Sequence, residues 1–285
     1  MRWLGGRESD NVEDRRGGGG GGLIVGGGIG TVVIAVIVML LGGDPSTILN
    51  QRSSQQEVSE APAGPQADDE AASFTRKVLA STEDVWTEIF RQQGGQYQQP
   101  TLVMFRNVTQ SGCGTASQAS GPFYCPGDRK LYIDLSFYDE LAQRFNAPGD
   151  FAMSYVIAHE VGHHVQKLLG VMDQTDALRQ RMSERQYNRV SVRLELQADF
   201  FAGVWAHHAK GQSIDFDQSD VEEALTAANA IGDDHIQRET QGTVVPDAFT
   251  HGTSAQRVYW FMKGLKTGDL KQGDTFNSRE DANLQ

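Results

Sequence analysis

Apolar and polar positions divide the chain into an apolar run, a polar stretch and a long mixed region. Residues 23–41, LIVGGGIGTVVIAVIVMLL, form an uncharged run of 19 residues, close to the roughly 20 residues that span a bilayer core. A cleavable signal peptide has a shorter apolar region with a small-residue cleavage site close behind it, and no such site follows here. The pattern predicts an uncleaved transmembrane anchor over 23–42, preceded by a short Gly-rich tail over 1–22.

The flanks of the apolar run indicate its orientation. Arg15 and Arg16 precede it and Asp44 follows it. Basic residues close to a span favour the cytoplasmic side. The sequence therefore predicts a single-pass protein with a cytoplasmic N-terminus and with the rest of the chain outside the cytoplasm.

The stretch after the anchor is polar. Residues 43–73 are rich in Ser, Gln, Pro, Ala and acidic residues and poor in aromatic ones. Such a segment buries too little apolar surface to offset its loss of conformational entropy. We predict a flexible tether over 43–73 and a globular domain over 74–285.

Within the predicted domain, two β-rich runs are followed mainly by segments of helical periodicity. Strands are predicted at 101–106 and 130–137, the second with alternating apolar and polar residues. Helices are predicted at 81–94, 151–169, 187–210, 219–231 and 254–265, with capping patterns at Ser81/Asp84 and Ser219/Glu222. Strands in the first half and helices in the second indicate an α+β domain.

Charge and cysteine content narrow the function. The formal net charge is −12 and no Lys/Arg-rich run occurs, which argues against a nucleic-acid partner. Cys113 and Cys125 flank a loop-like stretch of eleven residues. They are either two free thiols or a disulfide, and the predicted location outside the cytoplasm favours the disulfide.

The candidate chemistry lies in AHEVGHHVQ, residues 158–166. His159 and His163 are four positions apart, so on a helix they lie about 40° apart and can reach one metal ion. His164 lies about 140° from His159 and is not expected to join them. Glu160 flanks the histidine face, where a general base could contact a metal-bound water.

A catalytic zinc site needs a third protein ligand. One peptidase class has a later histidine, but Gln166 and Leu169 occupy the relevant positions here. Glu195 and Asp199 lie one turn apart on an otherwise apolar helix, where carboxylates are costly unless they are paired or bind a metal. We expect Glu195 to be the third ligand and Asp199 to accept a hydrogen bond from a ligand histidine. The alternative is a buried pair satisfied by Arg193 or by a helix cap.

Longer motifs support this interpretation. HEVGHH followed by ELQAD resembles the gluzincin type of zinc metallopeptidase. The chain resembles the bacterial neutral zinc metallopeptidase family more closely, through MRWLGGRESDNVEDRR, GCGTASQASGPFYCPGDRKLYIDLSFY and FTHGTSAQRVYWFMKGLKTGD. The resemblance spans nearly the whole chain.

The resemblance implies a zincin-like domain on the outer face of the bacterial inner membrane. It implies one catalytic Zn²⁺ held by His159, His163 and Glu195, with Glu160 as the base and a peptide or protein as the substrate. By analogy with zincins, the run KLYIDLSF could be the edge strand that pairs with an extended substrate. The sequence sets neither the substrate's identity nor an oligomeric state.

Residues of the C-terminal part have two interpretations each. In similar enzymes a later histidine stabilises the oxyanion, and His251 is the candidate, although it could instead belong to a helix-capping turn with Thr253 or Ser254. Arg257 could hold the substrate, but pairing with an acid is favoured. The other histidines, His164 included, lack ligand spacing and are expected at the surface or at helix caps.

Two functions follow from these observations. The first is a membrane-anchored zinc endopeptidase. The second is a non-catalytic module that keeps the fold or the zinc and binds a partner at the cell envelope. The intact Glu160 favours the first, because a binding module has no need of the base.

Overall fold

The computed structural model describes residues 1–284, apart from 4–5, 17–64, 144, 146 and 148. The predicted anchor, 23–42, and most of the predicted tether lie outside the described residues. Within them, no helix combines the length and the apolar character that a membrane crossing requires. The tether prediction was wrong for residues 65–73, which belong to helix α3, Pro65–Gln92.

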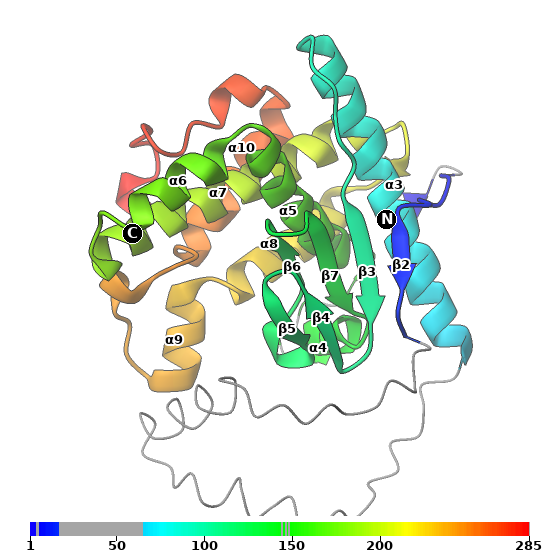
Figure 1. The fold of residues 1–285 in the computed structure, drawn as a ribbon, viewed down its shortest axis with the longest axis horizontal. Helices are drawn as coiled ribbons and strands as arrows, with labels where there is room; N and C mark the ends of the chain where they lie inside the picture. Colours follow the sequence, from blue (N-terminus) through cyan, green and yellow to red (C-terminus); the bar gives the residue numbers. More distant parts are fainter. Residues whose placement is uncertain (4–5, 17–64, 144, 146, 148, 285) are drawn as a thin grey trace, which may run out of the picture. The chain divides into compact units, whose positions relative to one another are not determined.

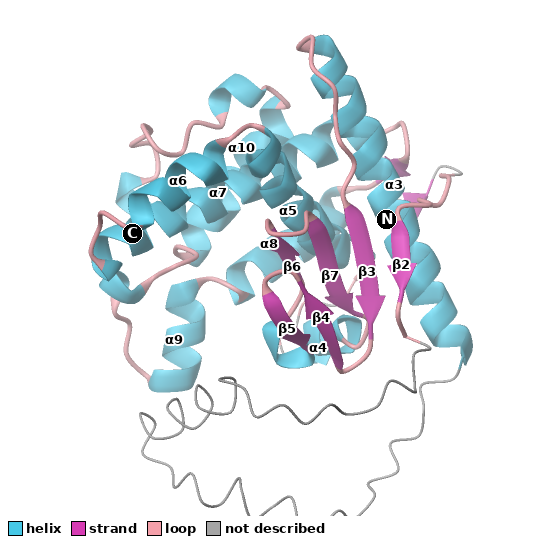
Figure 2. Cartoon of the chain, in the orientation of Figure 1, coloured by secondary structure: helices cyan, strands magenta, loops and turns pink. Residues whose placement is uncertain are grey.

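The main sheet has four strands in the order β2-β3-β7-β6 (Figures 1 and 2). These strands are Val12–Asp14 (β2), Thr101–Phe105 (β3), Lys130–Asp134 (β7) and Phe123–Cys125 (β6). Strands β2, β3 and β7 are parallel, whereas β6 is antiparallel to β7. Two small antiparallel pairs accompany this sheet: β4 (Val108–Ser111) with β5 (Gly114–Ser117), and β1 (Arg2–Trp3) with β8 (Ile214–Asp215).

Both faces of the two central strands are buried. One face contributes to the main helical core and the other to a smaller cluster with Ala116 of β5 and Cys125 of β6. The side chains on the first face are Leu102, Met104, Leu131 and Ile133, and those on the second are Val103, Phe105 and Tyr132. The predicted alternation along β7 therefore separates two buried faces, since Tyr132 and Asp134 are buried as well.

Helices make up most of the domain, and the predicted α+β class is confirmed. After α3 come α4 (Phe137–Gln143), α5 (Asp150–Leu168), α6 (Val171–Arg179), α7 (Glu184–Ala209), α8 (Gln218–Ala230), α9 (Asp233–Gln241) and α10 (Ser254–Thr267). Two predicted caps were wrong. Ser81 lies inside α3, and α8 is capped by Asp217, whose side chain accepts the backbone N–H groups of Ser219 and Asp220.

The N-terminal residues form part of the domain. Met1–Arg16 and Gln66–Gln285 make one compact unit, and Figure 1 shows β2 beside α3. The expectation of a separate tail over 1–22 therefore fails for residues 1–16. A three-residue strand with the sequence VED carries no periodicity from which a long-range pairing could be predicted.

Helices α7 and α10 approach unusually closely. A Cβ atom on Gly203 would lie 2.1 Å from the carbonyl oxygen of Phe261, and one on Gly264 would lie 2.1 Å from that of Phe200. Only glycine permits this backbone contact. Helix α5 packs against α7 of this pair.

Candidate metal centre

Helix α5 carries two of the three candidate ligands through the centre of the domain. Most of this helix is buried, and the rings of His159 and His163 lie on its shared face with centroids 4.8 Å apart. Both side chains are almost completely shielded from solvent. The i, i+4 spacing thus places the two imidazoles side by side, as helical geometry predicts.

Helix α7 brings Glu195 to the same point. The Nε2 atom of His159 lies 3.1 Å from one oxygen of the Glu195 carboxylate, and the Nε2 atom of His163 lies 3.5 Å from the other. One ligand atom from each of these residues lies within 4.8 Å of the other two. Two imidazole nitrogens and one carboxylate fit a zinc ion that keeps a fourth position open.

The glycine of HEVGHH allows α5 and α7 to meet at this point. A Cβ atom on Gly162 would lie 2.9 Å from the carbonyl oxygen of Ala198. Gly162, which stands between the two histidines in the sequence, therefore lies almost in contact with the backbone of α7 at Ala198, the residue before Asp199. This close approach is what places the Glu195 carboxylate within reach of both imidazoles.

Asp199 fixes His159. One carboxylate oxygen lies 2.8 Å from His159 Nδ1, and the same oxygen accepts a hydrogen bond from the Tyr155 hydroxyl. With Nδ1–H donating to Asp199, the Nε2 lone pair of His159 is directed toward Glu195. Arg257 donates to both carboxylate oxygens, from Nε at 2.8 Å and from Nη2 at 3.0 Å.

These contacts decide between the alternatives for the charged residues nearby. Arg257 is paired with an acid, as the sequence favoured, although it also lines the cavity described below. Arg193 pairs with Asp281 and not with Asp199 or Glu195. Tyr155 was missed from the sequence, since an aromatic residue on an apolar helix looks like an ordinary core residue.

Gln166 orients the ring of His163, as Asp199 orients that of His159. His163 Nδ1 lies 2.9 Å from Gln166 Oε1, and the Gln166 amide donates in turn to the carbonyl oxygen of Leu194 at 2.7 Å. This network leaves His163 Nε2 for a metal. The sequence reasoning missed Gln166, although its i+3 spacing from His163 was a usable signal.

In the His159–His163–Glu195 group, carboxylates stabilise the protonated histidines and the histidines stabilise the ionised Glu195. Before a cation binds, burial opposes protonation of His159, but the carboxylates of Asp199 and Glu195 together outweigh burial and raise the pKa to about 10. The pKa of His163 is raised as well, because Glu195 outweighs burial. Burial also opposes ionisation of Glu195, yet the two histidines hold its pKa well below the usual range.

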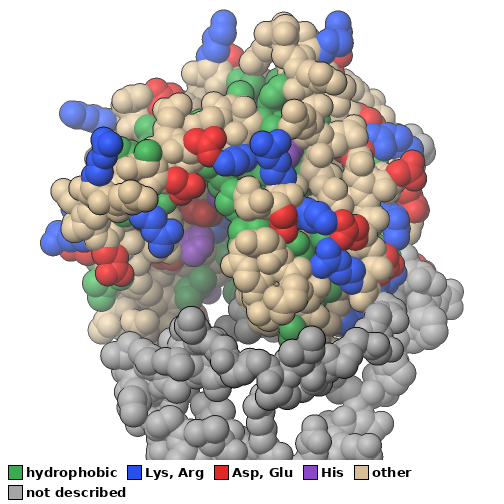
Figure 3. All heavy atoms as spheres, viewed as in Figure 1, with side chains coloured by type: hydrophobic (Ala, Val, Ile, Leu, Met, Phe, Trp, Pro, Cys, Tyr) green, Lys and Arg blue, Asp and Glu red, His purple; other side chains and the backbone are tan. Residues whose placement is uncertain are grey.

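Glu160 faces the same cavity with a different electrostatic character. The cavity has a volume of about 500 Å³ and is lined by His159, Glu160, His163 and Glu195, among others. Burial raises the pKa of Glu160 above its ordinary value. Figure 3 shows histidine and acidic side chains together in a recess of this face.

His251 lies on the wall of that cavity. Its Nδ1 is 3.2 Å from Asp233 Oδ1, and its backbone N–H donates to Asp233 Oδ2 at 2.6 Å. The hydrogen bond to Asp233 outweighs burial and raises its pKa. The cap of α10 is Thr253, which accepts from the backbone N–H of Gln256, so His251 does not serve as the cap.

His164 points away from the candidate ligands, as the helical geometry predicts. The expectation of a surface position was wrong, however, because its side chain is buried between Tyr124 and Gln98. Its Nε2 donates to the Gln98 carbonyl oxygen at 2.6 Å and its Nδ1 accepts from the Tyr124 hydroxyl. Burial lowers its pKa to about 4, so it is neutral at physiological pH.

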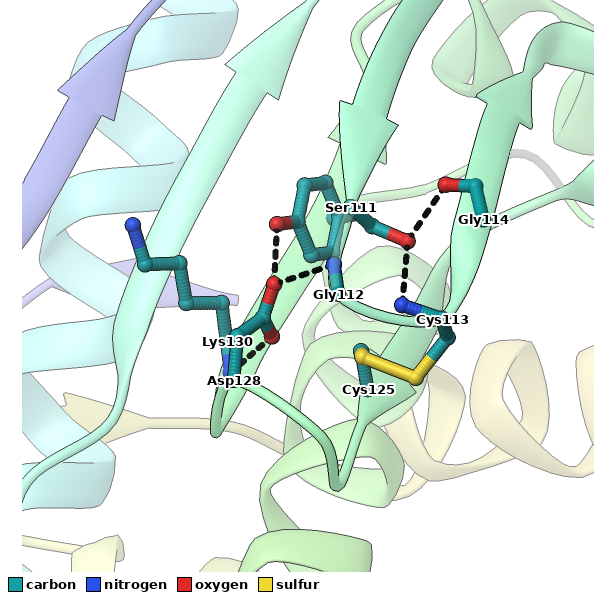
Figure 4. Close-up of a disulfide and its surroundings, with 8 residues drawn as sticks. Ser111, Gly112, Cys113, Gly114, Cys125, Asp128 and Lys130 are labelled. Atoms are coloured by element: carbon teal, nitrogen blue, oxygen red, sulfur yellow. Dashed lines mark hydrogen bonds between the residues drawn. A yellow bond between two sulfur atoms is a disulfide. The ribbon is translucent and has the colours of Figure 1, made fainter.

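The predicted disulfide is confirmed. Cys113 and Cys125 are bonded and connect the tip of the β4–β5 hairpin to β6 (Figure 4). Asp128 supports this region by accepting the N–H groups of Gly112 and Lys130, at 2.7 and 3.2 Å.

The edge strand beside the cavity is β6. Strand β7, which was expected at the edge, lies between β3 and β6. The cavity is lined instead by Phe123 and Tyr124 of β6 and by the segment just before them, Gln118–Pro122 except Ala119. The disulfide therefore holds one wall of the cavity.

Comparison with known proteins places these features in a family. The chain is 50% identical over 285 residues to the uncharacterized protein YpfJ of Escherichia coli K12, covering 97% of this chain and 99% of that protein. It is 42% identical over 194 residues to the uncharacterized protein Rv2575 of Mycobacterium tuberculosis H37Rv, covering 65% of this chain and 64% of that protein.

No solved structure matches the chain. The family model described as "Putative neutral zinc metallopeptidase" matches residues 1–276, a range that includes the N-terminal strands, the disulfide and the His159–His163–Glu195 group. The chain belongs to the family that this model describes.

Proposed function

We propose that the protein is a zinc-dependent endopeptidase. The observation that carries the proposal is the convergence of two oriented imidazole Nε2 atoms and the Glu195 carboxylate in one cavity, with a second acid, Glu160, on the cavity wall. A purely structural zinc site is usually closed by four protein ligands. This group has three and opens into a cavity large enough for part of a peptide.

Each residue of the site has a separate role in the proposed reaction. A zinc ion held by His159, His163 and Glu195 supplies Lewis-acid chemistry, polarising a carbonyl group and making a water molecule more acidic. Glu160 takes the proton of the attacking water and passes it to the leaving amine nitrogen. Burial raises the pKa of Glu160, which favours the first transfer, because a carboxylate with a low pKa accepts a proton from water poorly.

His251 stabilises the oxyanion in this proposal. Asp233 engages Nδ1, which leaves Nε2 as the nitrogen that donates to the substrate oxygen. The hydrogen bond to Asp233 raises the pKa of His251, which favours the protonated ring in which both nitrogens donate. A donor of this kind typically contributes about 10²–10³-fold to the rate.

The substrate is proposed to be an extended peptide that lies along β6. Its backbone could add to the edge strand of the sheet, and the aromatic side chains of Phe123 and Tyr124 would contact its side chains. Attachment to a membrane through residues 23–42 stays a prediction.

The test uses the full chain, purified in detergent with zinc. The variant Glu160→Gln should retain stoichiometric zinc but lose about 10²–10⁴-fold of the peptide cleavage activity, because only the proton acceptor is removed. The matched control is Glu184→Gln, an exposed acid at the start of α7, which should cleave at the normal rate. Metal content and the cleavage of a mixed peptide library by mass spectrometry provide the readout.

Two outcomes would contradict the proposal in different ways. If the protein binds zinc but cleaves no peptide of a broad set, the alternative of a non-catalytic binding module at the cell envelope is favoured. If Glu160→Gln cleaves as fast as the unmodified protein, Glu160 is not the base.

A further inference from the structure

The N-terminal motif has a structural role that is independent of the zinc chemistry. Arg7, Ser9 and Asn11 all donate to the carboxylate of Glu83, at 2.7, 2.6 and 2.7 Å. The Glu83 side chain, in the middle of α3, is fully buried. An ionised carboxylate is tolerated in such a position only with several donors, and all three of these donors come from one N-terminal stretch.

Backbone contacts extend the same attachment. Residues Val12–Asp14 pair in parallel with Leu102–Met104 of β3. The pairing continues on both sides, because Leu102 N–H donates to the Asn11 carbonyl oxygen at 2.9 Å and Arg15 N–H to that of Met104 at 2.8 Å. The N-terminal segment is therefore the edge strand of the main sheet.

The N-terminal segment and α3 stand on either side of residues 17–64 in the sequence, and they contact each other in the structure. The Arg76 guanidinium lies 3.7 Å from the Asp14 carboxylate, and Ser9 N–H donates to the Arg76 carbonyl oxygen at 3.1 Å. A bilayer core is about 30 Å thick. A single crossing by the apolar run 23–41 would put these contacting residues on opposite sides of that core.

We propose that Met1–Arg16 and residues 66–285 lie on the same side of the membrane. This replaces the expected orientation, in which the first 22 residues are cytoplasmic and the domain is not. It also accounts for the motif RESDNVEDRR, whose residues Arg7, Ser9, Asn11 and Val12–Arg15 contact the domain.

Single cysteines at exposed positions test the proposal in the full chain. Asp10→Cys reports on the N-terminal segment and Gln93→Cys on the domain, since both residues are exposed. Intact spheroplasts of an expressing bacterium are treated with a membrane-impermeant maleimide, before and after lysis. The unmodified chain, whose two cysteines form a disulfide, gives the background.

The proposal expects identical behaviour of the two positions: both are labelled before lysis, or both only after it. Labelling of one before lysis and of the other only afterwards would overturn it.

A cross-link provides the second measurement. Arg2 and Asp215 are register partners in the β1–β8 pair, so the double variant Arg2→Cys/Asp215→Cys should be joined by a short membrane-permeant bismaleimide. Arg2→Cys combined with Gln93→Cys, whose positions are not partners, is the control. Absence of the Arg2–Asp215 cross-link in protein that retains bound zinc would contradict a docked N-terminus, and this result does not depend on peptidase activity.

Discussion

Asp199 is the residue on which the proposed metal centre depends most among its neighbours. It is completely buried and contacts Tyr155, His159 and Arg257 at once. Burial opposes its ionisation, but Arg257 and His159 outweigh burial and lower its pKa to about 2. The carboxylate is therefore charged over the whole physiological range and orients His159 throughout.

The first prediction concerns this orientation. Asp199→Asn should weaken zinc binding by about 10–100-fold, because the amide no longer fixes the tautomer of His159. It should also destabilise the fold by about 3–5 kcal/mol, since the charge of Arg257 stays buried without its partner. Chelator competition measures the first effect and chemical denaturation the second.

The matched control for Asp199 is Asp281. Asp281 is equally buried and is also paired with an arginine, Arg193, but it does not contact the candidate ligands. Asp281→Asn should lower stability and leave zinc affinity unchanged. Equal zinc affinities for the two variants would show that Asp199 supports the fold alone.

The second prediction concerns pH. The pKa of His159 is raised from 6.5 to about 10 before a metal binds, so at neutral pH the ring holds a proton that zinc must displace. Zinc affinity should therefore rise with pH up to about 10, by up to tenfold per pH unit for each displaced proton. Titration calorimetry in buffers of different ionisation enthalpy measures the protons released; release of none at pH 7.5 would contradict the raised pKa.

For single residues, the sequence predicted the site correctly where the spacing along a helix determines the direction in which a side chain points. Helical geometry alone put His159 and His163 together and excluded His164. The spacing of residues within one helix does not show which residues of other elements they contact. The burial of His164 against Tyr124 and the hydrogen bond from Arg257 to Asp199 could therefore be found only in the folded structure. These contacts join residues 40 and 58 positions apart along the chain.

At the scale of elements, glycines decide how closely the helices pack. Gly162 lets α5 approach α7, and Gly203 and Gly264 let α7 approach α10. These positions hold the ligand-bearing helices at their crossing. The geometry of the metal centre is therefore set partly by residues without side chains.

The third prediction follows from the α7–α10 contact. Gly203→Ala should cost at least about 1–3 kcal/mol of stability, because its methyl group would overlap backbone atoms of α10 that cannot move separately. Thermal unfolding measures the loss. The control is Gly95→Ala, whose added Cβ would meet its nearest neighbours at an ordinary 3.6 Å; an equal loss in both variants would show that the contact is not responsible.

Four of the long helices were predictable because their apolar residues recur with the helical period, whereas the first part of α3, residues 65–80, was not predicted as helix. Helices α5, α7, α8 and α10 were placed within three residues of their observed ends. Short elements were not, because β1 and β2 contain two and three residues and form only when a distant partner is present. Polar strands of this kind carry no local pattern that distinguishes them from a loop.

For the whole molecule, the N-terminal segment joins parts of the chain that are distant in sequence. It contacts α3, β3 and β8. Its loss would remove an edge strand and expose Glu83. We therefore expect the stability of the domain to depend on residues 1–16.

The fourth prediction tests that dependence. Glu83→Ala should reduce the free energy of unfolding by about 1–3 kcal/mol, since Ser9 and Asn11 would lose a shared buried acceptor. Asp84→Ala is the control, because Asp84 is exposed and also pairs with Arg7, and exposed pairs contribute about 0–1 kcal/mol. Chemical denaturation compares the two; similar losses would mean that the N-terminal contacts at Glu83 contribute little.

The pairing of β1 with β8 has a consequence for biosynthesis. Arg2 and Asp215 are separated by 213 residues, and a ribosome adds about 5–20 residues per second. The segment that is made first must therefore wait about 10–40 s before its partner strand exists. Over that time Arg2 and Trp3 have no partner strand, and the nascent chain also carries the apolar run 23–41. Incompletely folded chains of this kind depend on chaperones to avoid aggregation.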